Sequence, residues 1–161
     1  MIITQYDACN PDALRPLVRP GDRVAGYVDG PCKWPAAAWS MFPGVPKVRI
    51  SVLGNDLADV YDWEKGTAPL SSVRAAVTWR RHVYLPSGVY CSESTWAAAA
   101  AALVGLPVVW WVAAWGASEW PTLSTSSGAI RAAAWQYASE ADHDVSRVDT
   151  TAWPVQGEPA P

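Results

Sequence analysis

Two carboxylates separated by a single residue, Asp62 and Glu64, end a short run of β-forming residues, 58–64. Side chains alternate in direction along a strand, so this spacing places both acids on one face, roughly 6–7 Å apart. Cleavage of a glycosidic bond uses one carboxylic acid as proton donor and a second carboxylate that stabilises positive charge or directs water. The pair therefore indicates glycosidase chemistry, with Glu64 as the general acid and Asp62 as the charge stabiliser.

Each acid also has an ordinary structural interpretation. Glu64 would otherwise form a surface ion pair with Lys65 or Arg74, and Asp62 would accept N–H bonds at a strand end. A catalytic Glu64 needs a raised pKa, which burial and the neighbouring Asp62 charge would both provide. A glycosidase therefore requires that both carboxylates lie in the same partly desolvated site.

The composition limits the possible partners. The chain has 161 residues, half of them hydrophobic, which predicts one globular domain with a sizeable core. Charged residues make up only 17% and the net charge is −3, with no basic cluster beyond Arg80-Arg81, so we expect no nucleic-acid partner. The eleven tryptophans are the outlier: most should fill the core, and two or three would suffice to stack on sugar rings.

The apolar segments predict neither a membrane span nor a secretion signal. The most apolar stretch, 95–115, is interrupted by Gly105 and Pro107 and predicts a helix followed by a strand. The first residues, 1–7, lack the basic and long apolar regions of a signal peptide. We therefore expect synthesis in the cytoplasm without a signal peptide, with export by another route left open.

Cysteine and histidine spacing predicts no metal site and no cofactor. The chain has three cysteines, Cys9, Cys32 and Cys91. They form no Cys-x-x-Cys pair, so free buried thiols are the preferred interpretation, with one disulfide left open. His143 stands between Asp142 and Asp144 in a polar turn, without a second histidine nearby, and is expected to be solvated.

The elements that must position the acids alternate between strand and helix. Strands are predicted at 23–29, 47–53, 58–64, 88–92, 108–115, 130–138 and 145–148, and helices at 11–14, 34–40, 67–81 and about 94–104. The segment 130–138 is also compatible with a helix. Alternating elements predict a parallel α/β sheet or barrel. A full eight-fold barrel needs about 250 residues, so we expect a single-domain, contracted or irregular (β/α) TIM-type barrel. This barrel would span 24–153, with an N-terminal extension (1–23) packed on it and a loose tail (154–161).

The segments at the predicted strand ends carry an ordered set of motifs. They are AGYVDG at 25–30, VRISV at 48–52, ADVYDWE at 58–64, GVYCS at 88–92, WWVAAW at 110–115, AWQY at 134–137 and DVS at 144–146. This set resembles the glycoside hydrolase family 25 (Chalaropsis-type) lysozymes. It is more similar still to the short glycoside-hydrolase-like barrels of actinobacteria and their phages. The chain departs from that pattern in its shorter length, in Trp115 where tyrosine is common, and in Trp63 between the two acids.

The resemblance implies a site at the C-terminal ends of the barrel strands. Its acids would be Asp29, Asp62, Glu64 and Asp144, and its sugar-contacting aromatic residues Tyr27, Tyr90, Trp111 and Trp135. Alone, Asp29 is equally typical of a turn before Gly30-Pro31, and Asp144 of a loop. Adjacent Trp110 and Trp111 must face opposite sides of their strand, and Trp63 must face away from the acids. The helical tryptophans Trp39, Trp79 and Trp96 are expected to pack.

The implied activity is that of a lysozyme-like muramidase or endolysin. It would hydrolyse β-1,4-linked amino-sugar polymers such as peptidoglycan, at the bacterial cell wall or as a virion component. The alternative is a non-catalytic glycan-binding or structural virion module built on the same barrel, because a fold does not determine a function.

Overall fold

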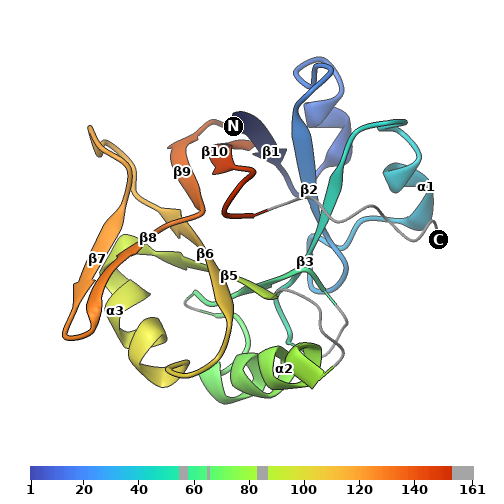
Figure 1. Cartoon of the computed structure of the whole chain (residues 1–161). Coiled ribbons are helices and arrows are strands. Elements are labelled where there is room, and N and C mark those ends of the chain that lie inside the picture. Colours follow the sequence, from blue (N-terminus) through green and yellow to red (C-terminus); the bar gives the residue numbers. More distant parts are fainter. Residues whose placement is uncertain (55–57, 65, 83–86, 154–161) are drawn as a thin grey trace.

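The computed structural model describes residues 1–54, 58–64, 66–82 and 87–153, and within them eight strands close into a barrel (Figure 1). Around the barrel the order is β1-β10-β9-β6-β5-β4-β3-β2. The strands are β1 (Ile2–Asp7), β2 (Arg23–Tyr27), β3 (Lys47–Ser51), β4 (Val60–Asp62), β5 (Ser87–Ser92), β6 (Val108–Ala113), β9 (Ala134–Ser139) and β10 (Asp144–Asp149). The mixed α/β class and the closed barrel expected from the sequence are confirmed.

All the barrel strands except β10 run in the same direction. Each pair from β1 to β6 around the barrel is parallel, as is β6 with β9, whereas β10 is antiparallel to both β9 and β1. A short turn, 140–143, joins β9 to β10, and a turn that short permits only antiparallel neighbours. The C-terminal ends of the parallel strands and the start of β10 therefore meet at one end of the barrel, here called the mouth.

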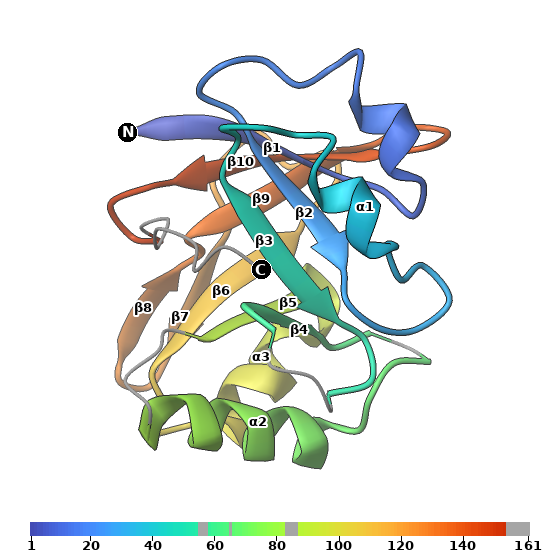
Figure 2. The ribbon, with the colours of Figure 1, turned by 90° about the vertical axis from the view of Figure 1, so that its right-hand side faces the viewer.

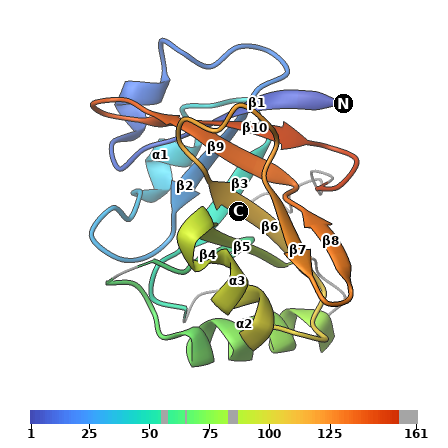
Figure 3. The same cartoon turned by 90° about the vertical axis from the view of Figure 1, so that its left-hand side faces the viewer.

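Helices cover only part of the outside. They are the 3-10 helix η1 (Pro11–Leu14), α1 (Ala36–Trp39), α2 (Leu70–His82) and α3 (Glu93–Ala102). Figures 2 and 3 show α2 and α3 together on the side opposite β1 and β10, and a hairpin of β7 (Thr122–Thr125) and β8 (Gly128–Arg131) beside β6 and β9. Among the described residues, no helix combines the length and the apolar character needed to cross a bilayer.

Strand alternation divides the apolar side chains into an outer and an inner core. Trp110 faces outward and packs with Trp96 of α3, whereas Trp111 lies in the barrel interior with Ile50 and Val148. The opposite orientations predicted for Trp110 and Trp111 are confirmed, as is the packing role of Trp96. Trp63 also packs against the outer core, as expected.

Two helical tryptophans differ in burial. Trp39 packs beside Trp34, with ring centroids 4.9 Å apart, as expected for a packing residue. Trp79 of α2 is instead half exposed, which corrects its predicted packing role. The buried residues of α2 are Val73, Val77 and Arg80, so Trp79 lies outside the face that packs.

The N-terminal segment contributes to the barrel itself. Residues 1–23 were expected to form an extension outside it, but β1 pairs with both β10 and β2 and closes the ring. Without β1 those two strands would present unpaired backbone edges, which folded proteins avoid. The predicted strand 130–138 is divided by Ala132 and Ala133 into β8 and β9. The predicted tail, 154–161, lies outside the described residues.

Cys9 and Cys32 form a disulfide, with their Cα atoms 4.5 Å apart. The preferred interpretation of free thiols is therefore wrong for this pair, while Cys91 is free and buried. The sequence offered no spacing signal, because the two cysteines meet only when the segments following β1 and β2 are brought side by side. The bond ties together two connections near the mouth.

Candidate functional site

Four acids gather at the mouth of the barrel. Asp7 ends β1, Asp62 ends β4, Glu64 follows two residues later, and Asp144 begins β10. Asp7 and Asp144 are direct register partners, which places their Cα atoms about 4.5–5.5 Å apart. Burial first, and then the charges of the other acids, raise the pKa values of Asp7, Asp62 and Glu64. The fold thus brings the predicted Asp62, Glu64 and Asp144 together.

Asp62 is a buried acid whose pKa lies well above its usual value. The residue is only 9% exposed, and its Oδ1 atom has no hydrogen-bond partner in the described ranges of the chain. Burial, and then the charge of Glu64, raise its pKa from 3.8 to about 7. In the free protein Asp62 therefore holds a proton through most of the acidic range, whereas the sequence-based interpretation made it the permanent anion.

Glu64 is more accessible than its neighbour. The residue as a whole is exposed, while its carboxyl group is partly desolvated. That desolvation and the charge of Asp144 raise its pKa, and a hydrogen bond with Tyr90 opposes the rise. Of the two predicted surface partners, Arg74 instead donates to the Ala102 carbonyl oxygen, and Lys65 lies outside the described residues.

Asp7 belongs to the site although sequence reasoning missed it. It is only 3% exposed, and burial, followed by the charges of Asp144 and Asp62, raises its pKa well above the usual value. A hydrogen bond from Tyr27 acts in the opposite direction. The signal was present: residues 2–7 form a β-rich run that ends in an acid, as in the other strands of the site.

Asp144 is only partly buried. Burial raises its pKa, while a hydrogen bond from Ser139 and the positive charge of a protonated His143 lower it. The His143 ring itself lies 2.7 Å, from Nδ1 to Oδ1, from Asp142. Within the described ranges, no three His, Cys, Asp or Glu side chains are arranged to hold a metal ion.

Asp29 does not join the other acids. Its carboxylate accepts hydrogen bonds from Ser51 Oγ at 2.5 Å and from the backbone N–H groups of Val52 and Leu53 at 2.7 and 3.2 Å. Because β2 ends at Tyr27, Asp29 lies beyond the strand, in the turn before Gly30. Its predicted catalytic role is therefore corrected: Asp29 fixes the segment that follows β3.

The predicted aromatic residues divide between the inside and the outside of the barrel. Tyr27 and Tyr90 face the acids, and Asp62 is the register partner of Tyr90. Trp111 is 1% exposed and lies edge-on to Tyr90, at 5.0 Å, with its Nε1 donating to Ser146 Oγ. Trp111 therefore supports Tyr90 from within the barrel and is not open to a ligand.

Trp135 faces the outside of the barrel. Its Nε1 donates to the Ala114 carbonyl oxygen at 2.9 Å, and its ring packs against Trp120 and Tyr137. Its inward neighbour Ala134 belongs to the inner core, so strand alternation turns Trp135 away from the acids. The predicted sugar contact of Trp135 is corrected to a packing role.

Two exposed apolar side chains stand at the mouth instead. Trp115 follows the end of β6 and is 61% exposed, and Leu53 follows the end of β3 and is half exposed. An exposed indole at the same end of the barrel as the acids offers a flat face on which a sugar ring can stack. Trp115 lies two residues beyond the end of β6, so strand alternation does not fix its direction, and sequence reasoning noted it only as a departure from the family pattern.

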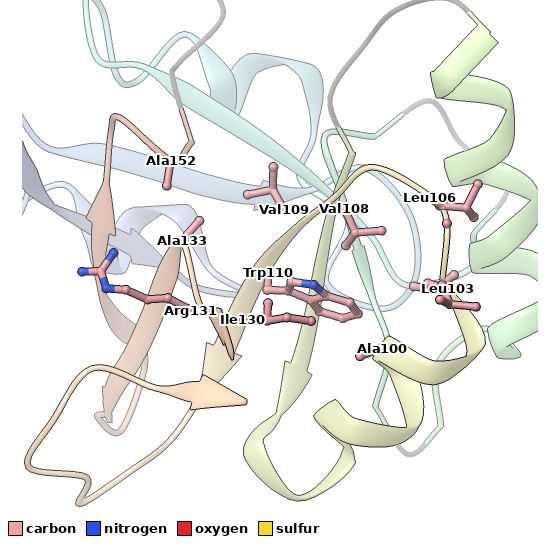
Figure 4. A pocket seen from close by; sticks show the side chains of 12 residues that line it. Ala100, Leu103, Leu106, Val108, Val109, Trp110, Ile130, Arg131, Ala133 and Ala152 are labelled. Carbon is pink, nitrogen blue, oxygen red and sulfur yellow. The ribbon is translucent and has the colours of Figure 1, made fainter. Parts of the chain in front are cut away.

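A cavity of about 400 Å³ lies away from the acids (Figure 4). It is formed where α3, the start of β6 and β8 meet. Its lining is mostly apolar and includes Leu103, Leu106, Val108, Trp110 and Ile130, with Arg131 at its edge. Among the described residues that line it there is no carboxylate, and none of the four acids of the mouth contributes to it.

Comparison with protein-family models, with curated proteins and with solved structures found no match for this chain. The candidate site is therefore defined by its own geometry: four acids and two tyrosines at the mouth of a closed barrel.

Proposed function

We propose that this protein is a glycoside hydrolase that cleaves β-1,4-linked amino-sugar polymers such as peptidoglycan. The observation that carries the proposal is the gathering of Asp62 and Glu64 with Asp7 and Asp144 at the mouth, with their pKa values raised. Perturbed acids grouped in one place are typical of catalytic sites. The sites of (β/α) barrel enzymes lie at this same end of the strands.

We also propose that the barrel is a contracted (β/α) barrel of the family 25 lysozyme type. In support, α2 and α3 follow β4 and β5 as in successive β/α units, and the parallel strands carry the acids at their C-terminal ends. In this interpretation the hairpin β7–β8 and the antiparallel β10 occupy the places of lost β/α units.

The two central acids would act as a pair that shares one proton near neutral pH. In the free protein the proton resides on Asp62, which has the more strongly perturbed pKa. A bound sugar would cover the exposed Glu64 and raise its pKa by desolvation. Positive charge developing on the sugar ring would favour ionised Asp62. The proton would then be on Glu64, which would donate it to the leaving oxygen as the glycosidic C–O bond breaks, while ionised Asp62 stabilises the positive charge. A water molecule would add to the sugar carbon and return a proton to the acid pair.

The remaining groups would position the sugar. The Tyr27 and Tyr90 hydroxyls, which bond Asp7 and Glu64, fix the orientation of those carboxylates. Trp115 provides an exposed face on which a sugar ring can stack. No cofactor takes part in this scheme.

Clearing of a turbid suspension of susceptible cell walls tests the proposal. The wild type should clear the suspension, and Glu64→Gln should lower the rate by at least about 100-fold, the contribution expected of a general acid. Glu119→Gln, at an exposed acid in the loop after β6, serves as the matched control and should clear at the wild-type rate. Equal clearing by Glu64→Gln and the wild type would refute the assignment.

One observation favours a second candidate, a glycan-binding or structural virion module without catalysis. Asp7 and Asp62 are buried, so neither is open to a substrate, and each has a carboxylate oxygen without a hydrogen-bond partner among the described residues. A module of this kind would sediment with insoluble cell walls and release no soluble fragments, and Glu64→Gln would sediment equally. Release of fragments by the wild type would exclude this candidate.

A further inference from the structure

We propose that the end of the barrel opposite the mouth binds a small monovalent anion, chloride or a close equivalent, between the side chains of Arg23 and Gln5. Both residues stand on barrel strands, Gln5 in β1 and Arg23 at the start of β2, and they are register partners. Both are 0% exposed. This site is independent of the glycosidase proposal, because it involves none of the four acids.

The two side chains present hydrogen-bond donors without an acceptor. Arg23 Nε donates to Gln5 Oε1 at 2.6 Å, which leaves the guanidinium atoms Nη1 and Nη2 and the amide Nε2 of Gln5. All three of these nitrogens are buried, and none has a hydrogen-bond partner within the part of the chain that the structure describes. An arginine carries only donors, and so does the amide nitrogen of a glutamine. The missing group must therefore be an acceptor of several hydrogen bonds.

The stacking of Arg23 restricts where that acceptor can lie. The guanidinium carbon is 4.1 Å from the centre of the Trp153 ring, so the indole covers one face of the planar group. Gly88 leaves room for this ring, because a Cβ atom there would lie 3.2 Å from Trp153 Cζ2. The N–H bonds point outward within the plane of the guanidinium group. The acceptor must therefore lie in that plane, beside the edge of the guanidinium, and not above its face.

The charge balance favours an anion over a water molecule. Asp59 is the carboxylate whose charge acts on Arg23, yet Asp59 is already bonded by Arg49 Nε and Nη2, both at 3.1 Å, and by Arg80 Nη2 at 3.5 Å. Burial lowers the pKa of Arg23 to about 9, so the group is still charged at neutral pH. A buried cation needs a counter-charge as well as hydrogen bonds. Water supplies only the hydrogen bonds, whereas an anion supplies both.

Thermal unfolding at constant ionic strength tests the proposal. Sodium chloride, bromide or nitrate is exchanged against sodium gluconate, whose anion is too large for an enclosed site. We expect the Tm to rise by about 3–5 °C for each tenfold increase in the small anion above its Kd. Arg23→Met should abolish this rise, while Arg15→Met, at an exposed arginine paired with Asp12, should retain it.

An equal Tm in all four salts, or the same rise in Arg23→Met, would overturn the proposal. If Arg23→Met does not fold, crystals of the wild type grown in bromide decide the question. We expect an anomalous peak within hydrogen-bond distance of the Arg23 Nη atoms. Density of a water molecule without an anomalous signal would overturn the proposal.

Discussion

Replacing Asp62 by asparagine should change how the stability of this protein depends on pH. The unfolded chain releases the Asp62 proton near pH 3.8, whereas the folded protein holds it until about pH 7. Between these values the folded state binds more protons than the unfolded state, so its stability falls as pH rises. Below pH 3.8 both states are protonated, and above pH 7 the loss is complete. Asparagine keeps the shape of the protonated acid and removes the titration.

The size of the effect follows from the same pKa values. A rise from 3.8 to about 7 corresponds to a loss of about 4 kcal/mol of unfolding free energy across this window. Ionised Asp62 is 9% exposed and has an unpaired Oδ1, so water can relieve only part of the penalty. We therefore expect Asp62→Asn to be more stable than the wild type by up to about 4 kcal/mol at pH 8 and by only about 1 kcal/mol at pH 4.5, where the unfolded chain has already begun to ionise.

Urea unfolding followed by tryptophan fluorescence at pH 4.5, 6 and 8 measures this difference. Asp12→Asn is the control, because the Asp12 side chain is 67% exposed and the variant should follow the wild-type curve. Asp7 is also buried with a raised pKa, so some decrease in stability with pH will remain in Asp62→Asn. If wild type and Asp62→Asn lose the same stability between pH 4.5 and 8, the burial argument for Asp62 is wrong.

Two further predictions concern the disulfide and the exposed tryptophan. Reduction should lower the stability of the wild type by about 3 kcal/mol, the loop-closure value for the separation of 23 residues between Cys9 and Cys32. A Cys9→Ser variant should be insensitive to reductant in urea unfolding, whereas Cys91→Ala should respond as the wild type does. Trp115→Ala should weaken binding of a chitin oligosaccharide by about 5-fold with little effect on stability, since stacking on an exposed ring contributes roughly 1 kcal/mol. Unchanged affinity, measured by calorimetry, would exclude Trp115 as the sugar platform.

The barrel and much of its mouth could be predicted from local patterns. The strand-end position of Asp62 and the opposite faces of Trp110 and Trp111 follow from strand alternation, whereas Glu64 lies two residues beyond the end of β4. Each of the features that follow from alternation is decided by residues close together in the sequence, and for that reason the prediction agrees with the structure.

The errors arose where contacts distant in sequence decide the outcome. Asp7 enters the site because β1 closes the barrel against β10, a pairing across most of the chain. Asp29 leaves it because its carboxylate is captured by the backbone after β3. Trp135 was predicted to contact sugar on the basis of its motif. Alternation along its strand nevertheless places it on the face opposite to Ala134 and Gln136. The pairing of Cys9 with Cys32 likewise depends on the assembled fold.

The most direct test of the proposed function is the chemical identity of the products released from purified peptidoglycan. We expect the wild type to generate new reducing ends and soluble muropeptides identifiable by mass spectrometry. Glu64→Gln should generate at least about 100-fold fewer, while Glu119→Gln matches the wild type. A wild-type protein that binds the same peptidoglycan yet releases no reducing ends above the buffer level would contradict the proposal that the four acids form a hydrolytic site.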